Sequence, residues 1–276
     1  MKIANRMEKL SPSVTMAITA LGRELKAQGK DILSFSAGEP DFNTPEIIKK
    51  SAIKAIEDGH TKYTAVEGIT ETKEAIIEKL KRDHNLNYNL DNIIVSNGAK
   101  HSLFNLFQLL IEDGDEVIIP APYWVTYPEQ VKFSNGVPVF IETDDSTGFK
   151  VTANQIKKAI TDKTKILVLN TPSNPTGAVY TEEELKEIGK VLEGTDILVF
   201  SDEMYEKIMY DGIKFTAAAQ VSDDMFQRTI TINGLSKSVA MTGWRFGYIA
   251  TPKTEIIKAM IKLQGQVTSN VNSITQ

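Results

Sequence analysis

The 276-residue sequence contains no cysteine, so disulfide bonds, thiolate metal sites and a cysteine nucleophile are all excluded. It also has no hydrophobic run long enough to span a bilayer, and its first residues lack the apolar core of a signal peptide. Basic residues are fewer than acidic ones, with 31 lysines and arginines against 36 aspartates and glutamates. This balance argues against binding to a nucleic-acid backbone. The composition predicts a cytoplasmic globular protein with neither membrane nor nucleic-acid partners.

Histidine is scarce as well, and its three positions offer no obvious chemistry. His60, His84 and His101 lie in unrelated contexts and form neither a zinc-ligand pair nor part of a catalytic triad. We interpret all three as structural and expect no metal site. The acidic residues give no metal site either, because Thr181 and Glu184 have the spacing of a capping box at a helix start.

The chain reads as an arm and one helix followed by alternating strands and helices. Ser11 is well placed as the N-cap of the first helix and Pro12 in its first turn, and Gly29 is placed to end it. Helices are also expected over 99–111 and 152–160 and after Thr181, and strands at "NIIVS", "DEVIIP", "GVPVFIE", "KILVLN", "DILVFSD", "RTITIN" and "FGYIAT". This alternation is typical of an α/β fold, in which helices cover both faces of a mostly parallel sheet.

Residues with chemical potential follow several of these strands, where ligands bind in a parallel sheet. After "NIIVS", Gly98 and Ala99 open a helix with bare backbone N–H groups, which is an anion site or simply a tight turn. After "DEVIIP", Trp124 offers a flat platform for a planar ligand or packs in the core. After "KILVLN", Asn174 lies in a rigid proline-bracketed turn that turn chemistry alone also explains.

Two more strand ends carry ionisable groups. Asp202 is the last residue of "DILVFSD", and Tyr205 follows three residues later. A carboxylate at this position could merely cap a helix. Lys237 follows "RTITI" among small and apolar neighbours; most lysines are solvated, but a desolvated one has a lowered pKa and becomes a nucleophile. Arg245 can present its guanidinium group to a phosphate. Together the strand ends supply the groups that pyridoxal 5′-phosphate (PLP) requires.

The sequence resembles the class I/II aminotransferases of PLP fold type I, and most closely the prokaryotic aspartate aminotransferase group. The resemblance rests on "AGEPDF", "TKYTAVEGI", "SNGAKHSLFNLFQ", "PYWVTYPE", "SNPTGAVY", "SDEMYE" and "NGLSKSVAMTGWRFGY". It implies a three-layer α/β/α large domain, and an enzyme that transfers the amino group of aspartate to 2-oxoglutarate. It also implies a homodimer with shared active sites.

The resemblance assigns a role to each candidate residue. Lys237 is the Schiff-base lysine and Asp202 pairs with the pyridine nitrogen, while Asn174 and Tyr205 bond the 3′ oxygen of the ring. Trp124 stacks on the ring. The phosphate is expected to contact Gly98, Ala99, Lys100 (through its backbone N–H), Ser236, Arg245 and, from the neighbouring subunit, Tyr63. The substrate is expected to contact Gly38, Trp124 and Asn174. Cis peptide bonds are expected before Pro122 and Pro175, partly on the same grounds.

The resemblance also predicts how the chain is organised. Relatives continue for about another hundred residues, roughly one small domain, so we expect a truncated chain whose small domain is largely missing. Residues 1–45 would belong with that small domain, and residues 46–276 would form the PLP-binding large domain. Because the missing part would carry the arginine that clamps the substrate α-carboxylate, we expect this form to bind PLP weakly and to show negligible turnover.

Other functions remain open on the same scaffold. They are aromatic or prephenate transamination, a C–S lyase reaction, or a catalytically idle PLP-binding domain. Members that also act on prephenate tend to carry lysine where this chain has Ser11, which favours aspartate.

Overall fold

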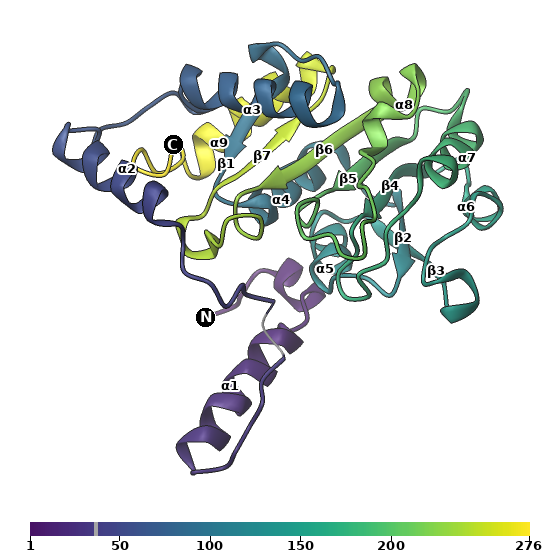
Figure 1. Cartoon of the computed structure of the whole chain (residues 1–276). Helices are drawn as coiled ribbons and strands as arrows, with labels where there is room; N and C mark the ends of the chain where they lie inside the picture. Colours follow the sequence, from purple (N-terminus) through teal and green to yellow (C-terminus); the bar gives the residue numbers. More distant parts are fainter. Residues whose placement is uncertain (36–37) are drawn as a thin grey trace.

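The computed structural model describes residues 1–35 and 38–276, so the "AGEPDF" motif lies within the described residues except for its first residue, Ala37. These residues form one seven-stranded sheet in the order β1-β7-β6-β5-β4-β2-β3 (Figure 1). The strands are β1 (Ile93–Ser96), β2 (Glu116–Ala121), β3 (Val137–Glu142), β4 (Thr164–Asn170), β5 (Leu198–Asp202), β6 (Thr229–Gly234) and β7 (Gly247–Ala250). β7 is antiparallel to both neighbours and every other adjacent pair is parallel, which confirms the predicted strands and the mostly parallel sheet.

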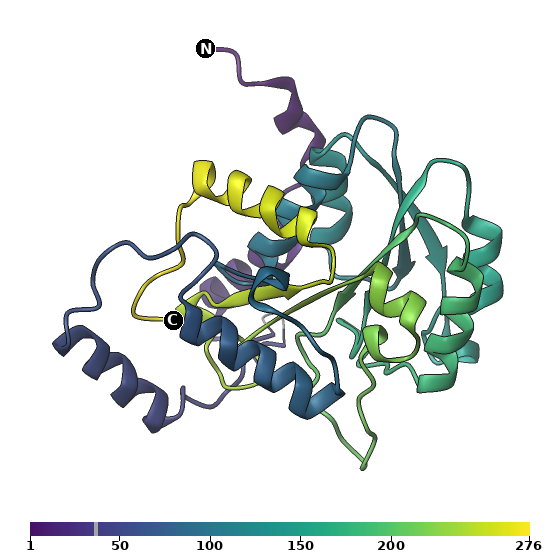
Figure 2. The same cartoon turned by 90° about the horizontal axis from the view of Figure 1, so that it is seen from above.

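Helices cover both faces of the sheet, as the sequence predicted (Figures 1 and 2). One face packs against α4 (Ala99–Leu110), α5 (Thr126–Phe133) and α9 (Thr254–Val267). The other packs against α3 (Thr70–His84), α6 (Ala153–Ala159), α7 (Glu182–Leu192) and α8 (Asp223–Arg228). The remaining elements are α2 (Glu46–Glu57) and the 3₁₀ turns η1 (Asn5–Lys9), η2 (Leu90–Asn92), η3 (Asp145–Thr147), η4 (Ala218–Gln220) and η5 (Thr242–Trp244).

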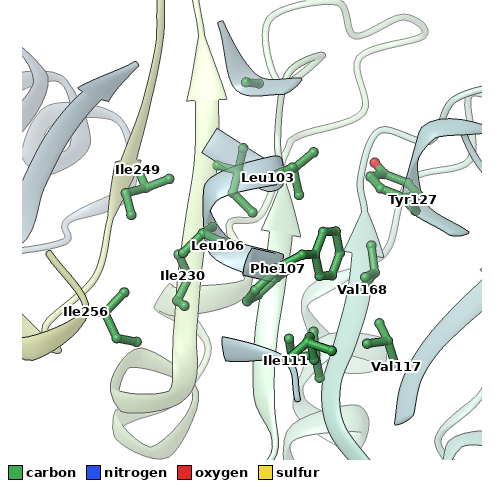
Figure 3. Packing of buried hydrophobic residues seen from close by; sticks show 14 of the residues in the cluster. Leu103, Leu106, Phe107, Ile111, Val117, Tyr127, Val168, Ile230, Ile249 and Ile256 are labelled. Atoms are coloured by element: carbon green, nitrogen blue, oxygen red, sulfur yellow. The ribbon is translucent and has the colours of Figure 1, made fainter. Parts of the chain in front are cut away.

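The alternation of side chains along each strand explains the two cores. Val168 of β4 packs against Phe107 of α4 on one face, in the cluster that Figure 3 shows, whereas the next residue, Leu169, packs in the cluster that includes Leu185 of α7. A continuous apolar strand is therefore buried on both faces. The capping box predicted for α7 is present, because Thr181 accepts the Glu184 N–H and its own N–H is bonded to the Glu184 carboxylate.

The N-terminal helix α1 (Val14–Ala27) buries none of its residues and stands away from the sheet in Figure 1. Its N-cap is Ser13, whose hydroxyl accepts the Met16 N–H, so the prediction of Ser11 as N-cap was wrong. The backbone N–H of Ser11 instead donates to a Glu129 carboxylate oxygen at 2.6 Å, which ties the arm to α5. Within the described residues, none of the helices combines the length and apolarity needed to cross a membrane.

Strand direction places several loops at one edge of the sheet. The carboxyl ends of β1, β2, β4, β5 and β6 meet there because these strands point the same way. β7 runs in the opposite direction, so its amino end, Gly247, lies at the same edge and pairs with Ser96 of β1 and Gly234 of β6. The loops before β7 and after the other five strands therefore converge.

Candidate active site

A pocket of about 640 Å³ lies at this edge of the sheet. Its lining contains most of the residues that the sequence assigned to a site, namely Gly38, Ala99, Lys100, Trp124, Asn174, Asp202, Tyr205, Ser236, Lys237 and Arg245. Gly98 lies behind the guanidinium group of Arg245, and Tyr63 is outside the lining and 90% exposed. The fold thus gathers side chains from loops that are far apart in the sequence.

Asp202 forms the floor of the pocket and is only 4% exposed. One carboxylate oxygen accepts the Tyr127 hydroxyl at 2.7 Å and the other accepts the Met204 N–H at 3.3 Å. Burial raises the pKa of Asp202 to about 6, although both hydrogen bonds act to lower it. Among the described residues, no lysine, arginine or histidine forms an ion pair with this carboxylate, and none is a cause of its pKa shift. A buried carboxylate that lacks a cationic partner favours the entry of a positively charged group from the pocket.

Tyr127 is a site residue that the sequence analysis missed. It lies in the first turn of α5, is 1% exposed, and packs edge-on against Trp124 with 5.4 Å between ring centroids. The aromatic stretch "YWVTY" was interpreted as a platform for a planar ligand or as core. A buried tyrosine hydroxyl needs a hydrogen-bond partner, but the sequence does not show which of these aromatic residues is buried beside a carboxylate.

Lys237 lies in the segment after β6 and is partly buried. Its Nζ donates to the Gly38 carbonyl and lies 5.9 Å from the centroid of the Tyr205 ring. Burial lowers the pKa of Lys237; Glu39 opposes this shift and Arg245 adds to it. A lowered pKa increases the fraction of neutral amine, which is the nucleophilic form.

Asn174 and Tyr205 approach each other from the loops after β4 and β5. The Asn174 side-chain amide donates to the Tyr205 hydroxyl at 3.3 Å, and the Asn174 backbone N–H donates to the Asn170 side chain at 2.7 Å. The peptide bonds before Pro122 and Pro175 are cis, which confirms the prediction, and a third cis bond precedes Pro172. The two polar groups thus face the pocket from adjacent strand ends.

The loop after β1 forms the anion-binding corner of the pocket. Gly98 has a φ of 88°, and a Cβ atom there would lie 2.5 Å from Nη2 of Arg245. A Cβ atom on Gly247 would likewise lie 2.4 Å from the Ala99 nitrogen. Both glycines are required because the arginine and the backbone approach too closely for a side chain.

Backbone amides complete this corner. The Gly98 N–H donates to the Ser96 carbonyl at 2.8 Å, so it is occupied. The N–H groups of Ala99 and Lys100, at the start of α4, have no acceptor among the described residues. These two amides, the Arg245 guanidinium group and Ser236 make an arrangement that suits a phosphate.

The side chain of Lys100 also reaches the pocket, although the sequence assigned only its backbone to the site. Its Nζ lies 4.9 Å from the centroid of the Trp124 ring. Burial and the neighbouring Arg245 lower the pKa of Lys100. The mouth of the pocket therefore carries a lysine that faces the same space as Lys237.

Comparison with known proteins identifies the family. The family described as aminotransferase class I and II matches residues 30–276. The chain is 53% identical to the aspartate aminotransferase of Bacillus subtilis (strain 168) over 276 residues, which are 100% of this chain and 70% of that protein. It is 51% identical to the probable aspartate/prephenate aminotransferase of Rickettsia conorii (strain ATCC VR-613 / Malish 7), covering 99% of this chain and 68% of that protein.

Two solved structures agree with the sequence comparison. The aspartate aminotransferase of Rhizobium meliloti superposes with a TM-score of 0.96 at 44% identity, covering 100% of this chain and 69% of that chain. The aspartate aminotransferase of Thermus thermophilus with maleate gives a TM-score of 0.95 at 42% identity, covering 100% of this chain and 71% of that chain. The chain belongs to the class I and II aminotransferase family.

Proposed function

We propose that this chain serves PLP-dependent transamination, in which the amino group of aspartate passes to 2-oxoglutarate. The observation that carries the proposal is Asp202, a buried carboxylate that opens to the pocket and has no cationic partner among the described residues. A protonated pyridine nitrogen would supply the missing positive charge. The anion-binding corner fits the cofactor's phosphate, because the Arg245 guanidinium group and the N–H groups of Ala99 and Lys100, which have no acceptor among the described residues, meet there.

Different residues of the pocket would contact different parts of the bound cofactor. Bound PLP supplies an aldehyde carbon that takes up the amino group and a ring that withdraws electrons from the substrate. Asp202 would hold the proton on the ring nitrogen, and Asn174 and Tyr205 would bond the ring oxygen. Trp124 would stack on the ring. Lys237 would bind the aldehyde carbon covalently and, as a neutral amine, would move a proton at the substrate α-carbon.

Aspartate is the substrate that the charges of the pocket favour. Lys100, Lys237 and Arg245 all line it, and Gly38 contributes backbone for the α-carboxylate. The second carboxylate of a dicarboxylic acid gains most from the side chain of Lys100, whose Nζ stands over Trp124. Ser11 and the relative solved with maleate, a dicarboxylate, support the same choice. A higher kcat/KM for prephenate or an aromatic amino acid than for aspartate would contradict it.

A homodimer is the assembly we propose, in the cytoplasm. Tyr63 is 90% exposed between α2 and α3, where it is available to a second copy of the chain. Exposed apolar side chains accompany it on α1 and α2, including Ile18, Leu21, Ile53 and Ile56. Large apolar side chains exposed on surface helices in this way are typical of an interface. Sedimentation equilibrium should give twice the mass of the chain, and a purely monomeric protein at micromolar concentration would rule the dimer out.

Reductive labelling tests the chemistry directly. The protein with bound PLP should absorb visible light, and borohydride should fix the mass of the cofactor on the peptide that contains Lys237. A Lys237→Ala variant should take no label, while Lys190→Ala, which changes an exposed lysine on α7, should label normally. Label on Lys100 instead of Lys237 would overturn the assignment.

A further inference from the structure

His101 lies in the first turn of α4, directly beside the two amides that face the anion-binding corner. Its Nδ1 lies 3.2 Å from the backbone nitrogen of Asn97, with the N–H pointing at it. Its Nε2 lies 3.2 Å from the side-chain amide of Asn105, which is completely buried. The imidazole therefore has a polar neighbour at each ring nitrogen.

The hydrogen bonds fix the protonation state of this ring. A backbone N–H can only donate, so Nδ1 must be unprotonated to accept the Asn97 N–H. A neutral imidazole then carries its proton on Nε2, which must donate to an oxygen. The orientation of the Asn105 amide that satisfies Nε2 is the one that turns Oδ1 toward it, and Oδ1 of Asn105 has no other hydrogen-bond partner among the described residues. Neutral, Nε2-protonated His101 fits this environment, and a charged imidazole does not.

Asn97 links this ring to the anion-binding corner. While its N–H is held by His101, its carbonyl accepts Nη2 of Arg245 at 3.3 Å. The next residue, Gly98, donates to the Ser96 carbonyl at 2.8 Å and leads directly into the free amides of Ala99 and Lys100. One of the hydrogen bonds that hold this turn is thus a contact that only the unprotonated Nδ1 can make.

The surroundings of His101 keep it neutral near pH 7. Burial lowers its pKa, and the positive charge of Arg245, from the segment before β7, lowers it further. Lys100, its neighbour on α4, reaches over Trp124. Among the described residues, the charged groups of the helices that pack on α4 do not contribute to this shift: Glu129 and Lys132 on α5, and Glu255, Lys258 and Lys262 on α9.

We propose that His101 is a positioning residue whose neutral imidazole holds the turn from Ser96 to Lys100 in the shape that binds the cofactor phosphate, and whose protonation releases that turn. The inference rests on the proposed function, because the phosphate is that of PLP. It changes the sequence interpretation of His101 as purely structural. It also makes phosphate binding by this protein dependent on a side chain that does not touch the phosphate.

Noncovalent probes test the positioning role. Pyridoxamine 5′-phosphate lacks the aldehyde, so it binds without a bond to Lys237, and pyridoxamine lacks the phosphate as well. His101→Ala should weaken the first probe about tenfold at pH 8, the effect of one lost structural hydrogen bond, and leave the second unchanged. His101→Gln keeps an acceptor oxygen and should bind both within about twofold of the parent. Equal losses for both probes, or none in the alanine variant, would overturn the proposal.

A pH series separates this role from ordinary stabilisation. The phosphate of the probe itself titrates near pH 6, so the parent and His101→Gln are compared at each pH. Their affinities for pyridoxamine 5′-phosphate should match at pH 8, and the parent should become progressively weaker than His101→Gln as the pH is lowered below the usual range of histidine, because the pKa of His101 is lowered. A constant ratio, or a parent that binds more tightly at pH 5.5, contradicts the mechanism. Failure of the parent to bind the probe at any pH would instead refute the proposed function.

The tautomer can be observed without any ligand. Nitrogen-15 NMR of the imidazole should show protonation on Nε2 alone at pH 8. A proton on Nδ1 at that pH would exclude the bond from Asn97, whatever the probes show.

Discussion

Two carboxylates that are neighbours in the chain, Asp202 and Glu203, belong to different regions of the molecule. The side chain of Asp202 contacts the pocket and accepts the Tyr127 hydroxyl on the face that carries α5. Glu203 is completely buried and accepts the Ser201 hydroxyl at 2.8 Å and the Ala218 N–H at 3.4 Å. Burial raises the pKa of both, to about 6 for Asp202 and about 8 for Glu203.

The difference between the regions lies in the counter-charges. Near Glu203, the carboxylate of Glu206 is paired with Lys79 and, at 2.7 Å, with His84. That cluster supplies its own cation, Lys79, whereas no cationic side chain among the described residues forms an ion pair with Asp202. A shifted pKa alone therefore does not mark the binding site, because burial produces it in both places. The missing counter-ion, next to an open pocket, is the feature that does.

Neutralising Asp202 is expected to have the largest effect. Asp202→Asn removes the charge that would stabilise a protonated ring, so kcat should fall by about 10²–10³, as for loss of one preorganised electrostatic group. Binding of pyridoxamine 5′-phosphate should weaken much less, because the phosphate corner is intact. Steady-state transamination and probe titration measure the two quantities. The comparison fails if Glu203→Gln, the matched change one residue away, lowers kcat as much.

Removing the charge of Glu206 from its cluster with Lys79 and His84 should affect stability instead of turnover. Glu206→Gln leaves Lys79 without its ion-pair partner in a mostly buried setting, so the free energy of unfolding should fall by about 3 kcal/mol. Urea unfolding at pH 7 measures it, and Glu182→Gln, which breaks an exposed pair with Lys186, should cost less than about 1 kcal/mol. Equal costs for the two variants would show that the cluster is not a buried ion pair.

The raised pKa of Glu203 should make the stability of the protein depend on pH. Its pKa is raised from 4.5 to about 8 in the folded protein, so its contribution to stability is complete below pH 4.5 and is lost as the pH rises toward 8. The parent should therefore lose on the order of 2–3 kcal/mol more than Glu203→Gln between pH 5 and pH 8. Urea unfolding at the two pH values gives the difference. Identical pH dependence in both proteins would mean that Glu203 ionises normally.

The smallest effect is expected from removing the Tyr127 hydroxyl, which donates a hydrogen bond to Asp202. Tyr127→Phe removes a hydrogen bond that lowers the pKa of Asp202, so the pKa of this carboxyl group in the cofactor-free protein should rise, which carbon-13 NMR measures. In the protein with bound PLP, kcat at pH 7 should fall about fivefold, equivalent to one hydrogen bond. Tyr210→Phe, at an exposed tyrosine, serves as the control. A fall in kcat with an unchanged pKa of Asp202 would point to packing instead.

Much of the fold was predictable because its signals are local. Apolar runs bounded by turn residues located all seven strands, and the strand ends located the loops that meet at the pocket. What the sequence analysis did not predict is the orientation of individual side chains. Nothing in the spacing of "PYWVTYPE" told which aromatic would point at Asp202, and His101 gave no sign that its ring would lie against the Asn97 N–H. These contacts depend on how α5 and α4 are rotated against the sheet, which tertiary packing decides.

The antiparallel strand β7 has a consequence for the order in which the molecule can mature. β1 joins the sheet through β7 alone among the described strands, and β7 follows the other described strands in the sequence, so it is synthesised after them. Until Gly247–Ala250 has been synthesised and inserted, β1 has no hydrogen-bonded neighbour and Arg245 has no place beside Gly98. Contacts between residues so distant in sequence form late in folding. In a nascent chain, Asp202 at the floor of the pocket is therefore synthesised before the anion-binding corner can form.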